Sequence, residues 1–136
     1  MTDNELILKA KEARLHSYSP YSSIAVGAAL LCASGKVYLG CNIESSAFSP
    51  TVCAERTAFF KAISEGEREF LAIAVVGGKE KCDTGSPFPP CGVCRQVMRE
   101  FCCDGFRVIL EGNNSPSVFT LGELLPNSFN SEKMKQ

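Results

Sequence analysis

Two short segments place the strongest constraint on how this chain can fold. One reads Cys53-Ala54-Glu55-Arg56, and the other reads Pro90-Cys91-Gly92-Val93-Cys94-Arg95-Gln96. Three cysteine thiolates suit Zn²⁺, and three protein ligands leave one coordination position open, as in catalytic zinc sites. A fold that uses all three ligands must therefore bring together two segments that lie far apart in the sequence.

Glu55 follows Cys53 by two residues and is the candidate acid–base group. Zinc lowers the pKa of a bound water enough to form hydroxide near neutral pH, and a nearby carboxylate can handle the proton. Residues two apart do not share a face of a regular helix. Both residues can serve one metal ion only if that ion lies over the end of a helix and not against its side.

Both cysteine segments are expected to open helices, which affects the charge of the site. Unpaired N–H groups and the positive end of the helix dipole favour thiolates at such positions. Three thiolates and one Zn²⁺ carry a net negative charge, which makes the metal a poorer acid for its water. A cation such as Arg56, hydrogen-bonded to a sulfur atom, would offset part of that charge.

Hydrophobic spacing predicts an alternation of helices and strands along the chain. Thr2 and Glu5 form a capping-box pattern, and Ser49-Pro50 is typical of a helix N-terminus. Long apolar runs predict strands that are buried on both faces. The predicted elements are helices at 4–16, from Ser49-Pro50 to about 66, from Cys91 to about 101 and at 120–125, with strands at 24–32, 36–41, 70–76, 106–110 and 117–119.

This order of elements predicts an α/β protein with a three-layer α/β/α fold and a mixed central sheet of about five strands. The chain has 136 residues, which is enough for one domain with a real core. We find no internal repeat and no domain boundary. Residues 1–136 are therefore expected to form a single catalytic domain, with residues after Phe129 polar and frayed.

Charge and hydropathy argue against nucleic acid and membrane partners. The chain has 14 basic and 15 acidic residues and no basic run. Its longest apolar stretch, at 24–33, is too short to span a bilayer. The polar N-terminus predicts no signal peptide and a cytoplasmic location. In that compartment the 8 cysteines are expected to bind metal or pack in the core.

Three other interpretations of the cysteines remain open at this point. A structural zinc site could take Cys102 or Cys103 as a fourth ligand, but it would leave Glu55 without a role. The C-x-x-C pair could be a redox pair, but that would leave Cys53 unexplained. The thiols could also be buried and inert. The joint pattern is more specific than the C-x-x-C pair alone, although it assigns no role to Cys82.

At these residues the chain resembles the cytidine deaminases, small zinc-dependent enzymes of pyrimidine salvage. The resemblance implies hydrolytic deamination of cytidine and 2′-deoxycytidine to uridine and 2′-deoxyuridine, with release of ammonia. It extends over nearly the whole chain and rests on YS at 21–22, VGAAL at 26–30, GCNIE at 40–44, CAERTA at 53–58, PCG at 90–92, CRQV at 94–97, ELLP at 123–126 and Phe129.

The resemblance also implies a role for each site residue. Glu55 would take a proton from the zinc-bound water and deliver it to ring nitrogen N3 and then to the leaving amine, as in zinc-dependent deaminases generally. The remaining implied roles are these: Cys53, Cys91 and Cys94 bind one Zn²⁺ per subunit, Arg56 donates to the thiolates, Asn42 and Glu44 hold the ribose hydroxyls, the Ala54 N–H and Ile24 lie at the base, and Phe129 is lent by a neighbouring subunit of a homotetramer.

The chain departs from the family pattern near the substrate. Ile24 stands where an aromatic residue is usual, and Phe48 stands where a tyrosine is common. A related deaminase of blasticidin S or of a free base is therefore the alternative function. Asn42 and Glu44 favour a pyrimidine nucleoside, because an amide and a carboxylate suit a sugar diol. An RNA-editing module is disfavoured by the near-neutral charge, and a non-catalytic zinc protein would leave Glu55 unused.

Overall fold

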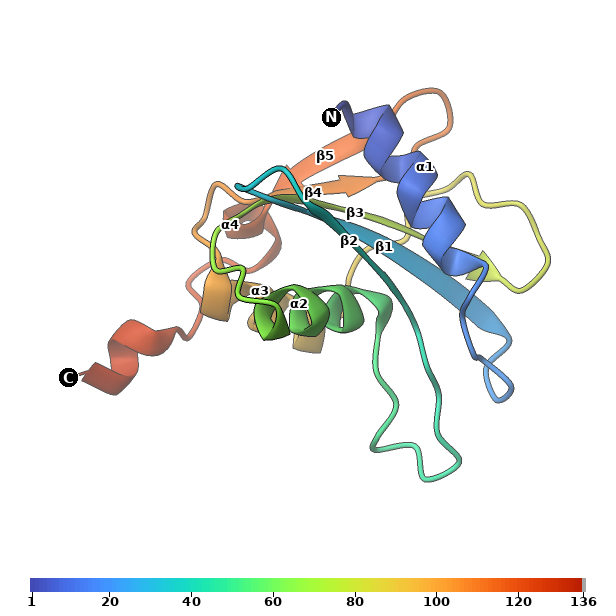
Figure 1. Ribbon diagram of the computed structural model, residues 1–136, viewed down its shortest axis with the longest axis horizontal. Coiled ribbons are helices and arrows are strands. Elements are labelled where there is room, and N and C mark those ends of the chain that lie inside the picture. The colour runs from blue at the N-terminus through green and yellow to red at the C-terminus, as the bar shows by residue number, and fades with distance from the viewer. Residues whose placement is uncertain (136) are drawn as a thin grey trace.

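The computed structural model describes residues 1–135 and contains a mixed five-stranded sheet (Figure 1). The strand order is β2-β1-β3-β4-β5, and β3 and β4 run parallel while all other neighbours are antiparallel. The strands are β1 (Ile24–Cys32), β2 (Val37–Cys41), β3 (Phe70–Lys79), β4 (Arg107–Leu110) and β5 (Ser117–Thr120).

Helices cover both faces of the sheet, which confirms the predicted α/β/α layers (Figure 1). Helix α1 (Asp3–Arg14) packs on one face, and α2 (Ala54–Ser64), α3 (Gly92–Phe101) and α4 (Leu121–Leu124) pack on the other. A 3₁₀ helix, η1 (Ser131–Lys135), stands off from the body at the C-terminus. Within residues 1–135, no helix has the length and apolar character needed to cross a membrane.

Small residues let α1 lie close to the sheet. Ala29, Ala72 and Ala74 are buried under this helix. A Cβ on Gly27 would lie 2.0 Å from the carbonyl oxygen of Ala10, so only glycine fits there. Since successive strand residues point to opposite faces, the neighbours of these residues in β1 and β3 face α2 and α3 and form the larger core cluster.

The predicted start of the second helix at Ser49-Pro50 is wrong. Helix α2 begins at Ala54, with Cys53 as its N-cap residue. Before the helix, Ile43 and Val52 exchange both backbone hydrogen bonds at 3.0 Å, so the chain between them closes into a loop. This non-local pairing outweighs the local preference of Ser-Pro for a helix start.

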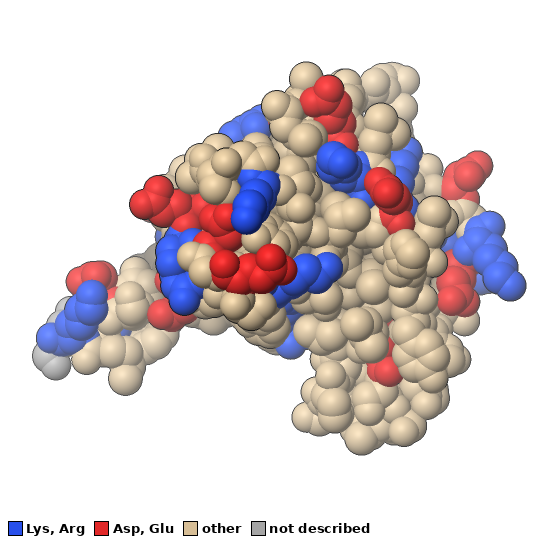
Figure 2. Space-filling model, in the orientation of Figure 1, with Lys and Arg blue, Asp and Glu red and all other residues tan. Residues whose placement is uncertain are grey.

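Other differences concern element lengths. Strand β3 continues to Lys79, three residues beyond the predicted end at Val76, so the segment between this strand and Cys91 is shorter than expected. Residues 131–135 form a 3₁₀ helix where fraying was expected. Figure 2 shows charges of both signs across one face, while the projection formed by the β2–α2 connection is nearly uncharged. Glu44 is the only charged residue between 42 and 53.

Candidate active site

Two helices begin at the same place with a cysteine in the N-cap position. Cys53 caps α2 and Cys91 caps α3, both with extended backbone and neither with a side-chain capping hydrogen bond. Cys94 lies in the first turn of α3 and is buried. The free N–H groups and the positive dipole ends of both helices therefore face one cluster of thiols.

The three sulfur atoms lie at distances that fit one zinc ion. Sγ of Cys91 is 3.9 Å from that of Cys53 and 3.5 Å from that of Cys94. Two sulfur ligands of a tetrahedral Zn²⁺ with Zn–S bonds of about 2.3 Å are about 3.8 Å apart. Within residues 1–135 no fourth histidine, cysteine or carboxylate joins this group, so Cys102 and Cys103 are not part of it. This arrangement disfavours a four-cysteine structural site.

Arg56 lies directly beside the cluster and favours the ionised thiol. Its Nη2 donates to Sγ of Cys53 at 3.2 Å. A hydrogen bond from the Cys94 thiol, together with this guanidinium, lowers the pKa of Cys53 to about 5 despite its burial. The same hydrogen bond and burial raise the pKa of Cys94. Cys53 is thus the first of the pair to become a thiolate, and Cys94 carries the proton that metal binding must displace.

Glu55 is the second residue of α2 and is only 4% exposed. Burial raises its pKa from 4.5 to about 7, and the negative charge of Cys53 adds to the effect. A carboxyl group with such a pKa can both accept and return a proton near neutral pH. Its position beside the N-cap cysteine meets the geometric condition set by the sequence, because the cluster lies over the end of α2.

A cavity of about 340 Å³ opens in front of the cysteine cluster. This volume is within the usual range for small-molecule sites. The predicted site residues that line it are Ile24, Asn42, Glu44, Cys53, Ala54, Glu55 and Cys91.

Asn42 is 8% exposed and its side chain is bonded to the backbone of β1. Its Oδ1 accepts from the Val26 N–H at 2.9 Å, and its Nδ2 donates to the Ile24 carbonyl at 2.8 Å. The amide therefore fixes the first residues of β1 against the end of β2. One N–H and one lone pair of the amide remain for another polar group.

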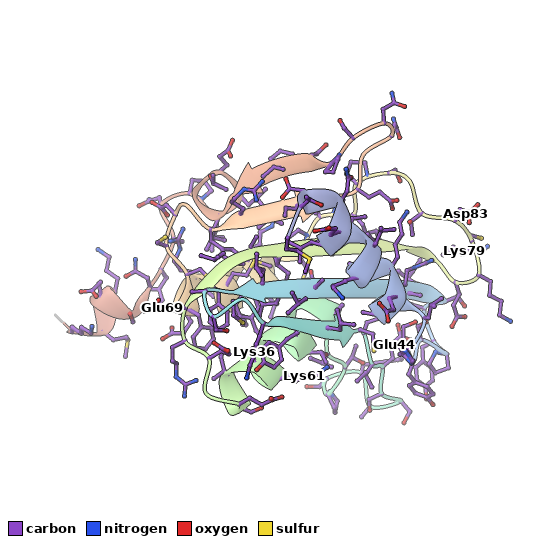
Figure 3. All side chains as sticks on the ribbon, turned by 45° about the horizontal axis from the view of Figure 1, so that its top comes forward. Lys36, Glu44, Lys61, Glu69, Lys79 and Asp83 are labelled. Atoms are coloured by element: carbon purple, nitrogen blue, oxygen red, sulfur yellow. The ribbon has the colours of Figure 1, made fainter. Side chains whose placement is uncertain are left out.

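Glu44 is held by donors from the 15–23 segment. The N–H groups of Tyr21 and Ser22 donate to its Oε1 at 3.0 and 3.1 Å, and the Ser22 hydroxyl donates to its Oε2. Hydrogen bonding from Ser22 lowers the pKa of this carboxyl group. Figure 3 shows Glu44 at the end of the sheet where Lys79 also lies, opposite Glu69.

The predicted site residues that do not line the cavity have other surroundings. Cys94 lies behind it, buried in the core, and Arg56 reaches the cluster through Cys53. Phe129 is 58% exposed and lies outside the cavity. Its carbonyl oxygen accepts from Nε2 of Gln96 in α3 at 2.9 Å, which ties the C-terminal segment to the metal-site helix.

Several residues to which the sequence assigned no role in the site also line the cavity, namely Ser22, Val26, Thr51, Val52, Phe88 and Pro89. Phe88 and Pro89 directly precede the Pro-Cys pair that opens α3. Nearness to a ligand cysteine was the one sequence signal that could have identified them.

Comparisons with known proteins agree with this geometry. A family model described as the cytidine and deoxycytidylate deaminase zinc-binding region matches residues 1–110. A cytidine deaminase from Sporosarcina psychrophila is 49% identical over 135 residues, covering 98% of this chain and 96% of that protein.

Solved structures and a more distant relative extend the comparison. The crystal structure of cytidine deaminase from Burkholderia pseudomallei matches with a TM-score of 0.86 and 46% identity, covering 95% of this chain and 100% of that one. A blasticidin-S deaminase from Bacillus cereus is 32% identical over 104 residues, 74% of each protein.

Proposed function

This chain belongs to the cytidine deaminase family, and on that premise we propose that its cavity binds cytidine and 2′-deoxycytidine and hydrolyses them. In this reaction a bond forms between C4 of the base and a water oxygen, the bond from C4 to the amino nitrogen breaks, and ammonia leaves. The observation that carries the proposal is a buried carboxyl group with a pKa of about 7 beside three thiols at zinc-binding distances. All 136 residues would act as one catalytic domain.

Cys53, Cys91 and Cys94 are the residues that would hold Zn²⁺. When bound, the ion supplies a Lewis acid that lowers the pKa of a coordinated water. Arg56, which donates to Cys53, offsets part of the negative charge of three thiolates. The N-termini of α2 and α3 do the same.

Glu55 carries the proton through the reaction. Its carboxylate form takes one proton from the attacking water, and its acid form gives that proton to N3. It then takes the second proton from the hydroxyl group now on C4 and gives it to the departing amine. A pKa of about 7 keeps both forms available at neutral pH. General acid–base groups of this kind contribute about 10²–10⁴-fold to the rate.

The polar residues at the outer end of the cavity orient the sugar. The Glu44 carboxylate accepts hydrogen bonds from ribose hydroxyls, and its contacts with Tyr21 and Ser22 keep it from turning away. Asn42 contributes the remaining hydrogen-bonding capacity of its amide. At the inner end, the Ala54 N–H donates to the base, because the first N–H groups of a helix have no acceptor within it.

The active form would be a cytoplasmic homotetramer in which a neighbouring subunit lends Phe129. Exposed Phe129 and the exposed side chains of Tyr18, Tyr21 and Phe48 support this assembly. Shared sites would complete the outer cavity. All eight cysteines are free, which fits a reducing compartment.

The proposal is tested by following ultraviolet absorbance of the zinc-loaded protein with cytidine, 2′-deoxycytidine, cytosine, CMP and blasticidin S. Loss of the two nucleoside signals, with one ammonia released per molecule, is the expected result. Turnover of only blasticidin S or cytosine would assign the site to another deaminase reaction. No turnover of any compound by zinc-loaded protein would overturn the proposal.

Glu55→Gln separates catalysis from metal binding. This variant keeps the size of the side chain but cannot carry the proton, so kcat is expected to fall by about 10²–10⁴-fold. Zinc content, measured by atomic absorption, should stay at one ion per chain. Loss of zinc together with activity would instead make Glu55 part of the metal site.

A further inference from the structure

Phe88 lines one wall of the cavity, and the resemblance to the family assigns this residue no role. It follows β3 on the loop that leads to Cys91, and it lines the cavity together with Ile24 and Val26 of β1. Among the described residues it is the only aromatic one that lines this cavity. Its side chain packs against the core and remains partly exposed.

Gly77 explains why the ring can lie there. In the β1–β3 register Gly77 is opposite Val26, so a side chain at 77 would point to the same face as Val26 and Ile24. A Cβ on Gly77 would lie 2.6 Å from Cδ1 and 2.7 Å from Cγ of Phe88. The Phe88 ring therefore rests directly on the backbone of β3, in the space that any larger residue at 77 would fill.

This places the ring on the same side of the sheet as the cysteine cluster. Val26, Cys53 and Phe88 all pack against the core cluster between the sheet and the helices α2 and α3. Ile24, on the neighbouring strand, presents an aliphatic side chain to the cavity. The flat apolar surface that a pyrimidine ring prefers is thus available from Phe88 and not from β1.

We propose that Phe88, seated on Gly77, is the residue of this chain that packs against the pyrimidine ring and sets the affinity for the base. The inference rests on the proposed function, since it takes the cavity to be the nucleoside site. It makes Phe88 a binding residue and Gly77 a positioning residue. Glu55 and the zinc site are not altered by it.

The first test compares Phe88→Leu with Phe70→Leu by steady-state kinetics on cytidine. Phe70 is a matched control, because it is also partly buried against the same core but lies at the start of β3, away from the cavity. F88L is expected to raise KM about tenfold, the size of one base–aromatic contact, with a smaller change in kcat. F70L should leave KM unchanged. Phe88→Tyr, which keeps a ring, should lose less affinity than F88L.

The second test displaces the Phe88 ring without substituting Phe88 itself. Gly77→Ala forces Phe88 out of its seat and should raise KM in the same direction as F88L. Gly85→Ala is the control, because a Cβ there meets no atom within 4 Å. G85A should keep the wild-type KM.

The outcomes separate this inference from the proposed function. A wild-type protein that fails on all pyrimidine nucleosides refutes the proposed function. An active wild type whose F88L variant keeps its KM, or whose F88L and F70L variants lose activity and melting temperature equally, refutes the role of Phe88 alone.

Discussion

Glu55 and Cys53 are two residues apart, yet their surroundings move their pKa values in opposite directions. Burial raises the pKa of Glu55 to about 7, whereas Cys94 and Arg56 lower that of Cys53 to about 5. Both shifts make folding stability depend on pH, because the folded and unfolded states bind different numbers of protons.

The two groups act against each other between pH 5 and pH 7. Between pH 5 and pH 7, Glu55 keeps its proton in the folded protein but loses it in the unfolded chain. This group therefore lowers the free energy of unfolding of the metal-free protein as pH rises. Over the same pH range, Cys53 loses its proton in the folded protein but keeps it in the unfolded chain. This group therefore raises the free energy of unfolding as pH rises. In the wild type the two effects therefore partly offset each other.

Glu55→Gln removes one of the two effects and should expose the other. From pH 5 to pH 7, the free energy of unfolding of metal-free E55Q is expected to rise by about 2 kcal/mol more than that of the wild type. Urea unfolding with a chelator and a reductant measures this. The exposed Glu69 provides the control, since Glu69→Gln should follow the wild type. Parallel pH profiles for E55Q and wild type would contradict the assigned pKa of Glu55.

At the level of elements, one strand–helix contact sets the position of the metal site. A Cβ on Gly40 of β2 would lie 2.3 Å from the carbonyl oxygen of Ala54 and 2.6 Å from the N–H nitrogen of Ala58. Ala54 is the first residue of α2 and stands between Cys53 and Glu55. The absence of a side chain at 40 therefore fixes how closely the first turn of α2 approaches the sheet.

Gly40→Ala is expected to push the start of α2 away from β2. Overpacking of this kind costs about 1–3 kcal/mol, and displacement of Cys53 should weaken zinc binding by about 10–100-fold, as for other changes next to metal ligands. Competition with a colorimetric zinc chelator measures the affinity. Gly85→Ala should match the wild type in both properties. Wild-type zinc affinity in a destabilised G40A would show that the helix start does not position Cys53.

On the scale of the whole molecule, several large apolar side chains at its edges are exposed to solvent. Phe129 is 58% exposed and Phe48 is 70% exposed. The nearly uncharged projection that carries Phe48 stands out from the body in Figure 2. These exposed apolar side chains are consistent with the proposed association of subunits.

Mixed assemblies of two variants test the proposal that neighbouring subunits share their sites. Glu55→Gln subunits lack the proton carrier but keep Phe129. Phe129→Ala subunits keep Glu55 but lack the aromatic side chain. Random co-assembly in a closed symmetric assembly should give about a quarter of wild-type activity. About a quarter of the sites then combine a subunit that has Glu55 with a neighbour that lends Phe129. The measurement is cytidine turnover after co-expression of the two differently tagged chains. The control is a mixture of the two variants made separately, under conditions in which subunits do not exchange. Activity no higher than in that control would mean that each site uses its own chain alone.

Much of the fold could be predicted because its signals are local. The capping boxes at Thr2 and Thr120 form as the spacing indicates. The apolar run of β1 is buried on both faces, and the helix after Cys91 begins where expected. Hydrogen bonding within a few residues and the period of the hydrophobic pattern determine each of these features. Neither signal could place the start of α2, which depends on the pairing of Ile43 with Val52.

The sequence by itself determined the ligand chemistry of this protein: three soft thiols, a carboxyl group two residues from one of them, and a cation beside it. Only the tertiary structure decided that the thiols meet at two helix ends, that Glu55 is buried deeply enough to shift its pKa, that Asn42 is bonded to β1, and that Phe88 reaches the cavity over Gly77. The physical reason is that residue types follow from the sequence, whereas burial and distance depend on contacts between segments far apart along it.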